Sequence, residues 1–310
     1  MAPAVTVTLD VEDLRPDHDL PERVVAMTDL VLDMLATAEV RASIFVVGEL
    51  AERRPGLVRR AARDGHEIGL HSWAHVPIPT QRPEDFLADI RRGRTLLQDL
   101  SGQEITGYRA PMMSLVPASS WAVPLIAEAG FTYSSSVLPG PSPLFGWPGL
   151  PRRPFRWADG PIEFPCPMVR LGPIDLPYLG GTYLRLLPAA VRRIGLRRAA
   201  RDEALWAYCH PWEFDTDEAF HPHDHIGTLA SRIAWLGRSR MGRQLGRLLA
   251  TGGRDEQEEE GRQQEDDHGQ PPPEVGTTDP WLGGGIVDVA AREHGDRGYR
   301  CAADPSGGPR

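Results

Sequence analysis

Short apolar runs alternate with amphipathic segments through the first 250 residues, and this alternation limits the possible folds more than any other feature of the sequence. The clearest runs are rich in β-branched or large apolar residues, as expected of buried strands: Val5–Leu9, Ser43–Gly48, Glu67–Leu70 and Ala204–Cys209. Between them, apolar residues recur at helical spacing, most clearly in Glu22–Ala38 and Pro83–Leu100. Strands that alternate with helices predict parallel βα units and therefore an α/β fold.

Weaker patterns extend this alternation. They predict helices at Leu50–Arg63, Ser119–Gly130, Pro188–Ala200 and Ile233–Leu249, and strands at Ile105–Tyr108, Phe131–Tyr133, Ile162–Phe164 and Met168–Val169. Gly65 suits the position just past a helix end, and Gly180–Tyr183 predicts a tight turn. Pro139–Gly160 is dense in proline, glycine and aromatic residues and has no period, which predicts an ordered loop.

Reactive side chains follow the predicted strands at the point where each strand ends. They are Asp10, His71, Arg109, Ser134 and His210. In a barrel of βα units the carboxyl ends of the strands share one face, and that face carries the active site. Chance placement of all these residues is improbable, so we expect them to form one site.

His71 and His75 are the strongest candidate ligands for a metal ion. Imidazoles four positions apart can point at one ion if the backbone after the strand turns helically. Two surface histidines often fall at this spacing by chance, so the pair alone is weak evidence. The other reactive residues at the same face of the sheet favour the functional interpretation.

The residue types together predict one reaction class. Two histidines and one carboxylate leave coordination positions open on a metal, as in catalytic sites. Such a metal polarises a carbonyl group and acidifies a bound water. A second carboxylate can act as a base, and a histidine from the opposite side can protonate a leaving amine. An arginine beside the base would keep it charged and oriented. These parts describe metal-assisted hydrolysis of an amide.

Composition divides the chain into two regions. The net charge is -9, but residues 251–310 hold 14 acidic and 6 basic residues, which leaves 29 and 28 in residues 1–250. The nearly neutral body argues against a nucleic-acid partner. From Thr251 onward charged residues, glycine and proline dominate and apolar residues are few. We therefore predict a folded domain over residues 1–250 and a disordered acidic tail over residues 251–310.

The remaining signals concern location. The three cysteines, Cys166, Cys209 and Cys301, form no C-x-x-C pair, which fits a reducing compartment. The first residues lack the basic and apolar segments of a signal peptide, and no run approaches the length of a membrane span. We therefore expect a cytoplasmic protein without a membrane span.

Several motifs resemble those of the polysaccharide deacetylase family, also known as the NodB homology family or carbohydrate esterase family 4. The matching stretches are Thr8–Asp13, Ala62–Ile68, His71–His75, Gly107–Pro111, Gly130–Ser136 and His210–Glu213. They span residues 5 to about 215 in the family order, and they look closest to the branch associated with exopolysaccharide loci and exosortase systems. The tail shows no such resemblance.

The resemblance implies a fold, a reaction and a role for each residue. The fold would be a distorted (β/α) barrel of the NodB type with fewer than eight strands. Members usually remove N-acetyl groups from amino sugars with a divalent metal, which we expect to be zinc. Asp10 would be the base and Arg109 its partner. His71 and His75 would bind the metal, and His210 would be the general acid.

The sequence departs from the family pattern in two motifs. The commoner first motif has adjacent aspartates, whereas here Asp10 precedes Val11, Glu12 and Asp13. On a continuing strand Glu12 shares a face with Asp10 and is the favoured metal ligand, although a turn after Leu9 could present Asp13 instead. The fourth motif usually has an aspartate after its tyrosine, where this chain has Ser134. If that aspartate orients a partner in the family, the change to serine would make the activity weak or altered.

Other candidate residues have an ordinary explanation that we favour or weigh equally. His221, His223 and His225 form a second histidine cluster, which we interpret as a solvated loop rather than a metal site. The arginines of Pro188–Ala200 are interpreted as a solvated face rather than a surface for an anionic lipid-linked glycan. Trp147 and Trp157 fit sugar stacking and core packing equally well.

The sequence therefore predicts a metal-dependent N-deacetylase that acts on an N-acetylated amino-sugar glycan, either exopolysaccharide or its precursor. One alternative is a deformylase or amidohydrolase that acts on a small molecule or a lipid-linked sugar. The other is a non-catalytic glycan-binding relative, of which Ser134 would be the first sign.

Overall fold

A single curved sheet organises the molecule in the computed structural model, which describes residues 5–15, 21–199, 204–222, 227–250 and 287–289. Its strand order is β10-β1-β2-β3-β4-β5-β7-β6-β11. The strands from β10 to β7 in this order pair in parallel throughout, which gives seven parallel strands in the described part of the chain. The predicted distorted (β/α) barrel is confirmed, whereas the implied limit of fewer than eight strands holds for the parallel strands alone, because β6 and β11 extend the described sheet to nine strands.

The parallel strands are short. They are β1 (Val5–Val11), β2 (Ser43–Val46), β3 (Glu67–Leu70), β4 (Gly107–Tyr108), β5 (Tyr133–Ser134), β7 (Ile162–Glu163) and β10 (Leu205–Cys209). Side chains alternate across a strand, so Thr8 and Asp10 of β1 point into the barrel while Leu9 and Val11 point toward the helices.

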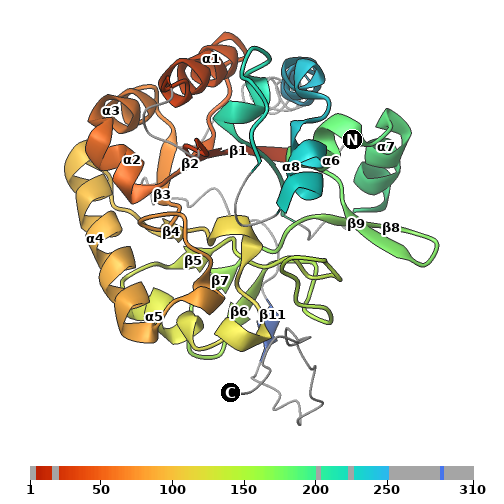
Figure 1. The fold of residues 1–310 in the computed structure, drawn as a ribbon. Helices are drawn as coiled ribbons and strands as arrows, with labels where there is room; N and C mark the ends of the chain where they lie inside the picture. The colour runs from red at the N-terminus through yellow and green to blue at the C-terminus, as the bar shows by residue number, and fades with distance from the viewer. Residues whose placement is uncertain (1–4, 16–20, 200–203, 223–226, 251–286, 290–310) are drawn as a thin grey trace, which may run out of the picture.

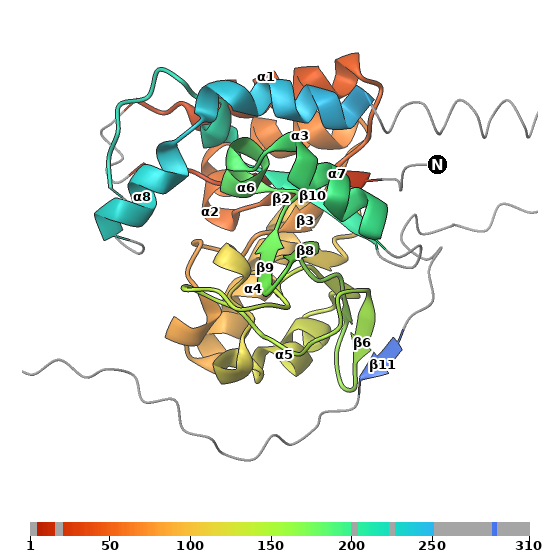
Figure 2. The ribbon, with the colours of Figure 1, turned by 90° about the vertical axis from the view of Figure 1, so that its right-hand side faces the viewer.

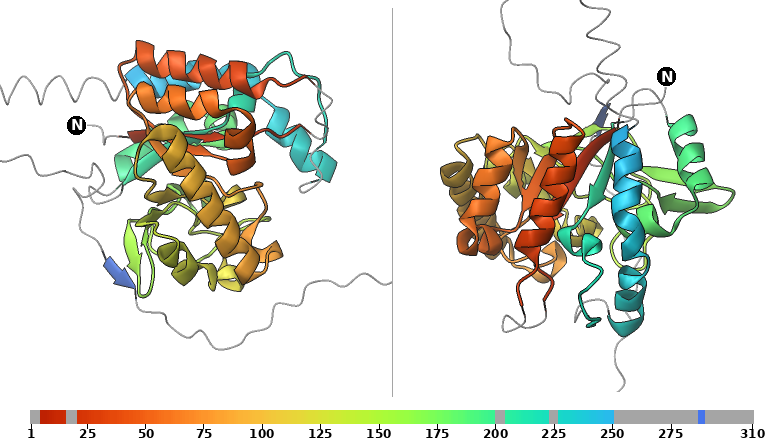
Figure 3. Two further views of the ribbon diagram at one scale, coloured as in Figure 1. Left: turned by 90° about the vertical axis from the view of Figure 1, so that its left-hand side faces the viewer. Right: turned by 90° about the horizontal axis from the view of Figure 1, so that it is seen from above.

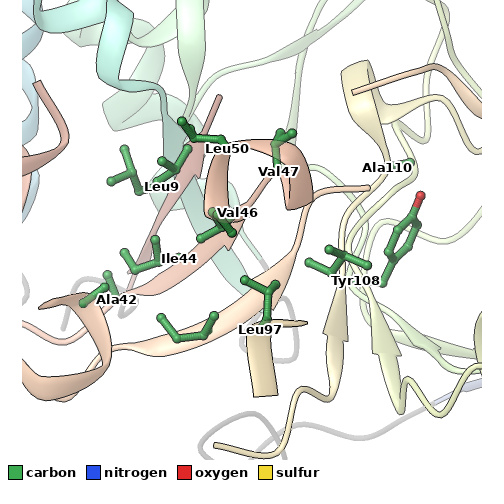
Figure 4. Packing of buried hydrophobic residues seen from close by; sticks show 14 of the residues in the cluster. Leu9, Ala42, Ile44, Val46, Val47, Leu50, Leu97, Tyr108 and Ala110 are labelled. Carbon is green, nitrogen blue, oxygen red and sulfur yellow. The ribbon is translucent and has the colours of Figure 1, made fainter. Parts of the chain in front are cut away.

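Helices cover the outer face of the sheet and bury the main core against it (Figure 1). They are α1 (Val24–Thr37), α2 (Gly48–Arg53), α3 (Pro55–Arg63), α4 (Pro83–Ser101) and α5 (Ala122–Glu128). Figure 4 shows members of this core from neighbouring strands, such as Leu9 and Ile44, together with Leu97 of α4. Single-turn helices lie in the connections: η1 (Ile78–Thr80), η2 (Pro111–Met113), η3 (Pro117–Ser119), η4 (Pro211–Phe214) and η5 (Arg238–Arg240).

One predicted helix is in fact two. The segment Leu50–Arg63 is divided into α2 and α3 at Arg54, whose φ of -131° and ψ of 60° are not helical. Proline at position 55 has no N–H to donate and crowds the preceding residue out of the helical conformation, which explains the break. Gly65 adopts the predicted left-handed conformation, with φ at 83°.

The second half of the chain departs more from expectation. The predicted loop Pro139–Gly160 contains β6 (Phe155–Trp157), which pairs antiparallel to β7. Met168–Val169 is the start of β8 (Met168–Leu171), which forms a hairpin with β9 (Ile174–Pro177). The predicted tight turn at Gly180–Tyr183 is wrong because Gly181 begins α6 (Gly181–Leu186). Figure 2 shows this hairpin below α6 and α7 (Ala189–Arg198).

The last helical material closes the core. Residues 227–235 form α8 (Gly227–Trp235), and residues 241–250 are helical. The 241–250 helix lies next to α1 in Figures 2 and 3 and buries Met241, Leu245 and Leu249 in the main core. No helix in the described ranges combines the length and apolar character needed to cross a bilayer.

The acidic tail lies almost entirely outside the described residues. Its described part is β11 (Val287–Val289), which runs parallel to β6 at the edge of the sheet. The sequence does not predict this strand, because its short apolar segment is isolated among charged residues and glycines. The division into residues 1–250 and 251–310 stays a prediction.

Candidate active site

The parallel strands bring the predicted reactive residues to one end of the barrel. His71, Arg109 and His210 each follow the last residue of a strand, as predicted. Asp10 and Ser134 instead lie within β1 and β5, because β1 continues to Val11 and β5 ends at Ser134. This one-residue difference leaves both side chains buried at the same end of the barrel.

Glu12, His71 and His75 form a cluster in which one ligand atom of each residue lies within 4.8 Å of the others. The Glu12 carboxylate is 3.7 Å from His71 Nε2 and contacts His75 Nε2. His71 Nδ1 lies 2.9 Å from the carbonyl oxygen of Arg109. A carbonyl can only accept, so Nδ1 carries the proton and the Nε2 lone pair faces the cluster.

The two histidines converge without the predicted helical turn. The chain from His71 to His75 is irregular, with left-handed φ values of 60° at Ser72 and 56° at His75. The Ser72 hydroxyl accepts a hydrogen bond from the His75 N–H at 2.9 Å. The carbonyls of Ser72 and Trp73 accept the first N–H groups of α2, which are otherwise without helical partners. The two histidines lie close together, as their spacing predicts, but the predicted helical turn between them is wrong.

Asp13 does not join the cluster. Its carboxylate accepts hydrogen bonds from Arg15 Nε at 2.9 Å and Nη2 at 2.6 Å, and Arg53 lies 3.4 Å away. Side chains alternate between the two faces of an extended chain, so Asp13 lies on the face opposite to Asp10 and Glu12 and faces away from the imidazoles. Of the two alternatives for the carboxylate ligand, the structure places Glu12 beside the histidines.

Asp10 and Arg109 form a buried ion pair next to the cluster. Arg109 Nη1 donates to Asp10 Oδ1 at 2.6 Å and to Thr8 Oγ at 2.7 Å. Arg109 Nε and Nη2 donate to the carbonyl and hydroxyl of Ser135 at 3.3 and 3.0 Å. The pairing of Arg109 with Asp10 that the family resemblance implies is therefore present in the structure.

The planar guanidinium of Arg109 stacks against two aromatic rings, those of Phe45 and Trp206. Its central carbon lies 4.1 Å from the ring centroid of Phe45 and 4.3 Å from that of Trp206. Phe45 lies beside Asp10 in the register of β1 and β2, and Trp206 comes from β10. A guanidinium stacked between rings and hydrogen-bonded in its plane has little freedom to rotate.

His210, which follows β10, faces the carboxylates of both Asp10 and Glu12. Its Nε2 lies 3.9 Å from Asp10 and 3.8 Å from Glu12, while its Nδ1 bonds to Glu213 at 3.0 Å. Trp212 stacks on the imidazole and donates its indole N–H to Glu12 at 2.8 Å. His75 and His210 are 20% and 15% exposed, against 3% for Asp10, so a substrate would approach between the histidines.

Charge interactions shift the pKa values of two site groups. Burial raises the pKa of Glu12, but the nearby His75 and His210 outweigh it and hold the pKa well below its usual value. Burial lowers the pKa of His210, but Glu12, Glu213 and Asp10 raise it to about 9. Glu12 is therefore ionised at neutral pH and His210 carries a proton.

Glu213 and Arg185 support His210 and were not predicted. Arg185 of α6 is 1% exposed, and its Nε lies 2.9 Å from the buried Glu213 carboxylate. Its Nη groups donate to the carbonyls of Ala234 and Leu236 at 2.8 Å. Only the unusual position of an arginine within an apolar helix turn signals this pair in the sequence, because its partner is distant along the chain.

The remaining candidates have structural roles or lie outside the described residues. Trp147 and Trp157 pack with centroids 5.2 Å apart against the main core, which favours core packing over sugar stacking. Arg192 of α7 is buried and bonds to Leu184 and Gln244, so that helix is not wholly solvated. His221 lies 3.5 Å from Glu218, whereas His223 and His225 lie outside the described residues.

We expect Arg185→Ala to destabilise the protein strongly, because it takes one of two cationic partners, the other being His210, away from the buried Glu213 carboxylate. The free energy of unfolding, measured by chemical denaturation, should fall by about 3–5 kcal/mol. Arg193→Ala on the exposed face of α7 is the matched control and should change it by less than about 0.5 kcal/mol. Equal effects of the two variants would contradict the role assigned to the buried pair.

Comparisons with known proteins identify similar sequences and a similar fold. Residues 3–134 match the family model described as polysaccharide deacetylase, and residues 135–255 match a domain of unknown function. A solved structure from Mycobacterium smegmatis, provisionally named a polysaccharide deacetylase, superimposes with a TM-score of 0.51 at 20% identity. That match covers 88% of this chain and 95% of the other and supports the barrel fold.

Curated relatives match over a shorter stretch. The peptidoglycan-N-acetylglucosamine deacetylase of Listeria monocytogenes is 34% identical over 86 residues, which are 28% of this chain and 18% of that protein. The enzyme of the same name from Bacillus cereus is 32% identical over 84 residues, 27% of this chain and 30% of that one. The matched stretch is thus less than a third of the length of either relative. Residues 3–134 thus match the polysaccharide deacetylase (NodB homology) family.

Proposed function

We propose that this protein is a hydrolase that removes N-acetyl groups from an amino-sugar polysaccharide with the help of a divalent metal ion. The observation that carries the proposal is the arrangement of Asp10 and His210. Asp10 is held by Arg109 on one side, and His210 faces it at 3.9 Å beside the Glu12 cluster. A base and an acid beside one set of candidate metal ligands are what metal-assisted amide hydrolysis requires.

The donor set of Glu12, His71 and His75 fits a catalytic metal. One carboxylate and two imidazole nitrogens, with the His71 lone pair turned toward the cluster, suit zinc and leave coordination positions open. When bound there, zinc would polarise the amide carbonyl and make water a better nucleophile at neutral pH. The hydrogen bond from His71 to the Arg109 carbonyl orients the ligand, as partners of metal-bound histidines usually do.

The protein groups supply the proton transfers. Asp10, oriented by the hydrogen bond from Arg109, takes a proton from the attacking water. His210 carries a proton on Nε2, because its Nδ1–H is bonded to Glu213, and gives the Nε2 proton to the leaving amine. The C–N bond breaks, and the products are acetate and the free amino sugar.

Relatives suggest the substrate class. The matched curated proteins are named peptidoglycan-N-acetylglucosamine deacetylases, which favours an N-acetylated glycan. Within that class we propose exopolysaccharide or its precursor, following the motif resemblance to the exopolysaccharide-associated branch. A cytoplasmic location would fit a precursor better than a finished polymer.

Metal binding should depend on Glu12 and not on Asp13. We expect Glu12→Gln and His75→Ala to weaken zinc binding by about tenfold or more, because each removes a ligand atom from the cluster. Asp13→Asn is the matched carboxylate control and should bind zinc as the unaltered protein does. Isothermal titration of metal-stripped protein measures all of them. A loss of affinity in Asp13→Asn alone would reverse the assignment.

Acetate release is the test of the activity itself. The full chain should release acetate from N-acetylated chitooligosaccharides after zinc is restored, and neither metal-stripped protein nor His71→Ala should do so. Zinc binding without release from any oligosaccharide would favour the small-molecule or lipid-linked-sugar alternative. Neither binding nor release would favour a non-catalytic glycan-binding role.

A further inference from the structure

Three consecutive serines connect Arg109 to the second half of the chain. Ser135 accepts two hydrogen bonds from the Arg109 guanidinium, through its carbonyl at 3.3 Å and its hydroxyl at 3.0 Å. Ser136 Oγ accepts the N–H of Ala110 at 2.9 Å and a hydrogen bond from Ser134 at 2.8 Å. The serine segment 134–136 thus fixes both the Arg109 side chain and the backbone that follows it.

Glu163 of β7 holds this segment from behind. One oxygen, Oε1, accepts the N–H groups of Ser136 at 2.7 Å and of Val137 at 3.0 Å. The register pairs Glu163 with Ser134, and the N–H of Phe164 donates to the Ser134 carbonyl at 2.8 Å. The Ser135 hydroxyl in turn donates to the Phe164 carbonyl at 3.2 Å. Residues 134–137 are therefore tied to Glu163 and to Phe164, the residue that follows it.

Glu163 is a carboxyl group buried at a cost in free energy, which its hydrogen bonds to the backbone offset. It is 0% exposed, and burial raises its pKa against the lowering effect of the hydrogen bonds from the Ser136 and Val137 N–H groups. A carboxyl group in such a place costs free energy unless it is hydrogen-bonded, and an apolar side chain would fill the same space at no such cost. Its two accepted N–H bonds are the specific function that an apolar residue could not perform.

We propose that Glu163 is a positioning residue for the proposed deacetylase, acting through Ser135 and Ser136 to hold Arg109 in the orientation that pairs with Asp10. It does not touch the space between Asp10 and His210, so it takes no part in the proton transfers. It also explains how Arg109 is oriented in a chain with serine at position 134. The inference rests on the proposed function only for its kinetic consequence, because the geometry can be tested without activity.

The first test follows the Arg109 side chain directly by NMR. The Nε–H signal, assigned by its loss in Arg109→Lys, should exchange with water about tenfold faster in Glu163→Ala than in the unaltered protein, as expected when one hydrogen bond of ordinary strength is lost. Glu163→Gln keeps an oxygen that can accept both N–H groups and should retain most of the protection. Unchanged exchange in Glu163→Ala would overturn the proposal.

A matched control separates positioning from general loosening of the sheet. Glu67 is a carboxylate at the other end of the barrel, where it accepts a hydrogen bond from Tyr133 at 2.7 Å and contacts Ser43. Glu67→Ala removes comparable bonds without touching segment 134–136. It should leave the Arg109 exchange rate unchanged, and an equal acceleration in this variant would also overturn the proposal.

The second test is a double-mutant cycle on acetate release. Glu163→Ala should lower kcat about tenfold or more with KM unchanged. In a Ser135→Ala background the same substitution should cost less, because the hydroxyl bond to Arg109 is already lost and the Ser135 carbonyl bond alone remains for Glu163 to position. A loss of the same factor in both backgrounds would show a merely structural role and contradict the proposal. If the unaltered protein releases no acetate, the proposed function fails, and Arg109 exchange alone decides the role of Glu163.

Discussion

The rest of the structure depends on one buried ion pair, between Arg109 and Asp10. Removing two charges from water costs several kcal/mol for each ion unless geometry and hydrogen bonds compensate. Here the compensation comes from four strands: Thr8 and Asp10 on β1, Phe45 on β2, Trp206 on β10 and Ser135 next to β5. The guanidinium is satisfied only if these strands meet in the observed parallel register. The barrel and the candidate site therefore stabilise each other.

The two halves of the chain contribute differently to this site. Residues 3–134, which match the deacetylase family model, carry the cluster of Glu12, His71 and His75, together with Asp10 and Arg109. Residues 135–255, which match a domain of unknown function, carry His210 and the buried groups behind the site. Glu213 orients His210, Arg185 compensates Glu213, and Glu163 fixes the serine segment. Supporting groups of this kind set the orientation of catalytic ones, so the second half completes the site.

The strand ends could be predicted from sequence, because strand patterns are local and parallel strands share one carboxyl end. His71, Arg109 and His210 lie where these rules place them. The path between His71 and His75 could not be predicted, since it depends on left-handed residues anchored to α2. Arg185 and Glu163 could not be predicted either. Their partners lie far away in sequence or behind a strand, and no local pattern marks an acid or an arginine as buried. The orientation of Asp13 depends on where β1 ends. The run of acidic residues after Leu9 does not mark that end in the sequence, so Glu12 and Asp13 remained alternatives.

The central claim is that Asp10 performs the chemistry while Glu12 and the histidines hold the metal. The most direct measurement is acetate release by Asp10→Asn, compared with its zinc affinity. The variant keeps a side chain that can hydrogen-bond Arg109 but is a far weaker base. We predict zinc binding equal to that of the unaltered protein and a fall in kcat of about a hundredfold or more. Turnover close to that of the unaltered protein would contradict the assignment of Asp10 as the base.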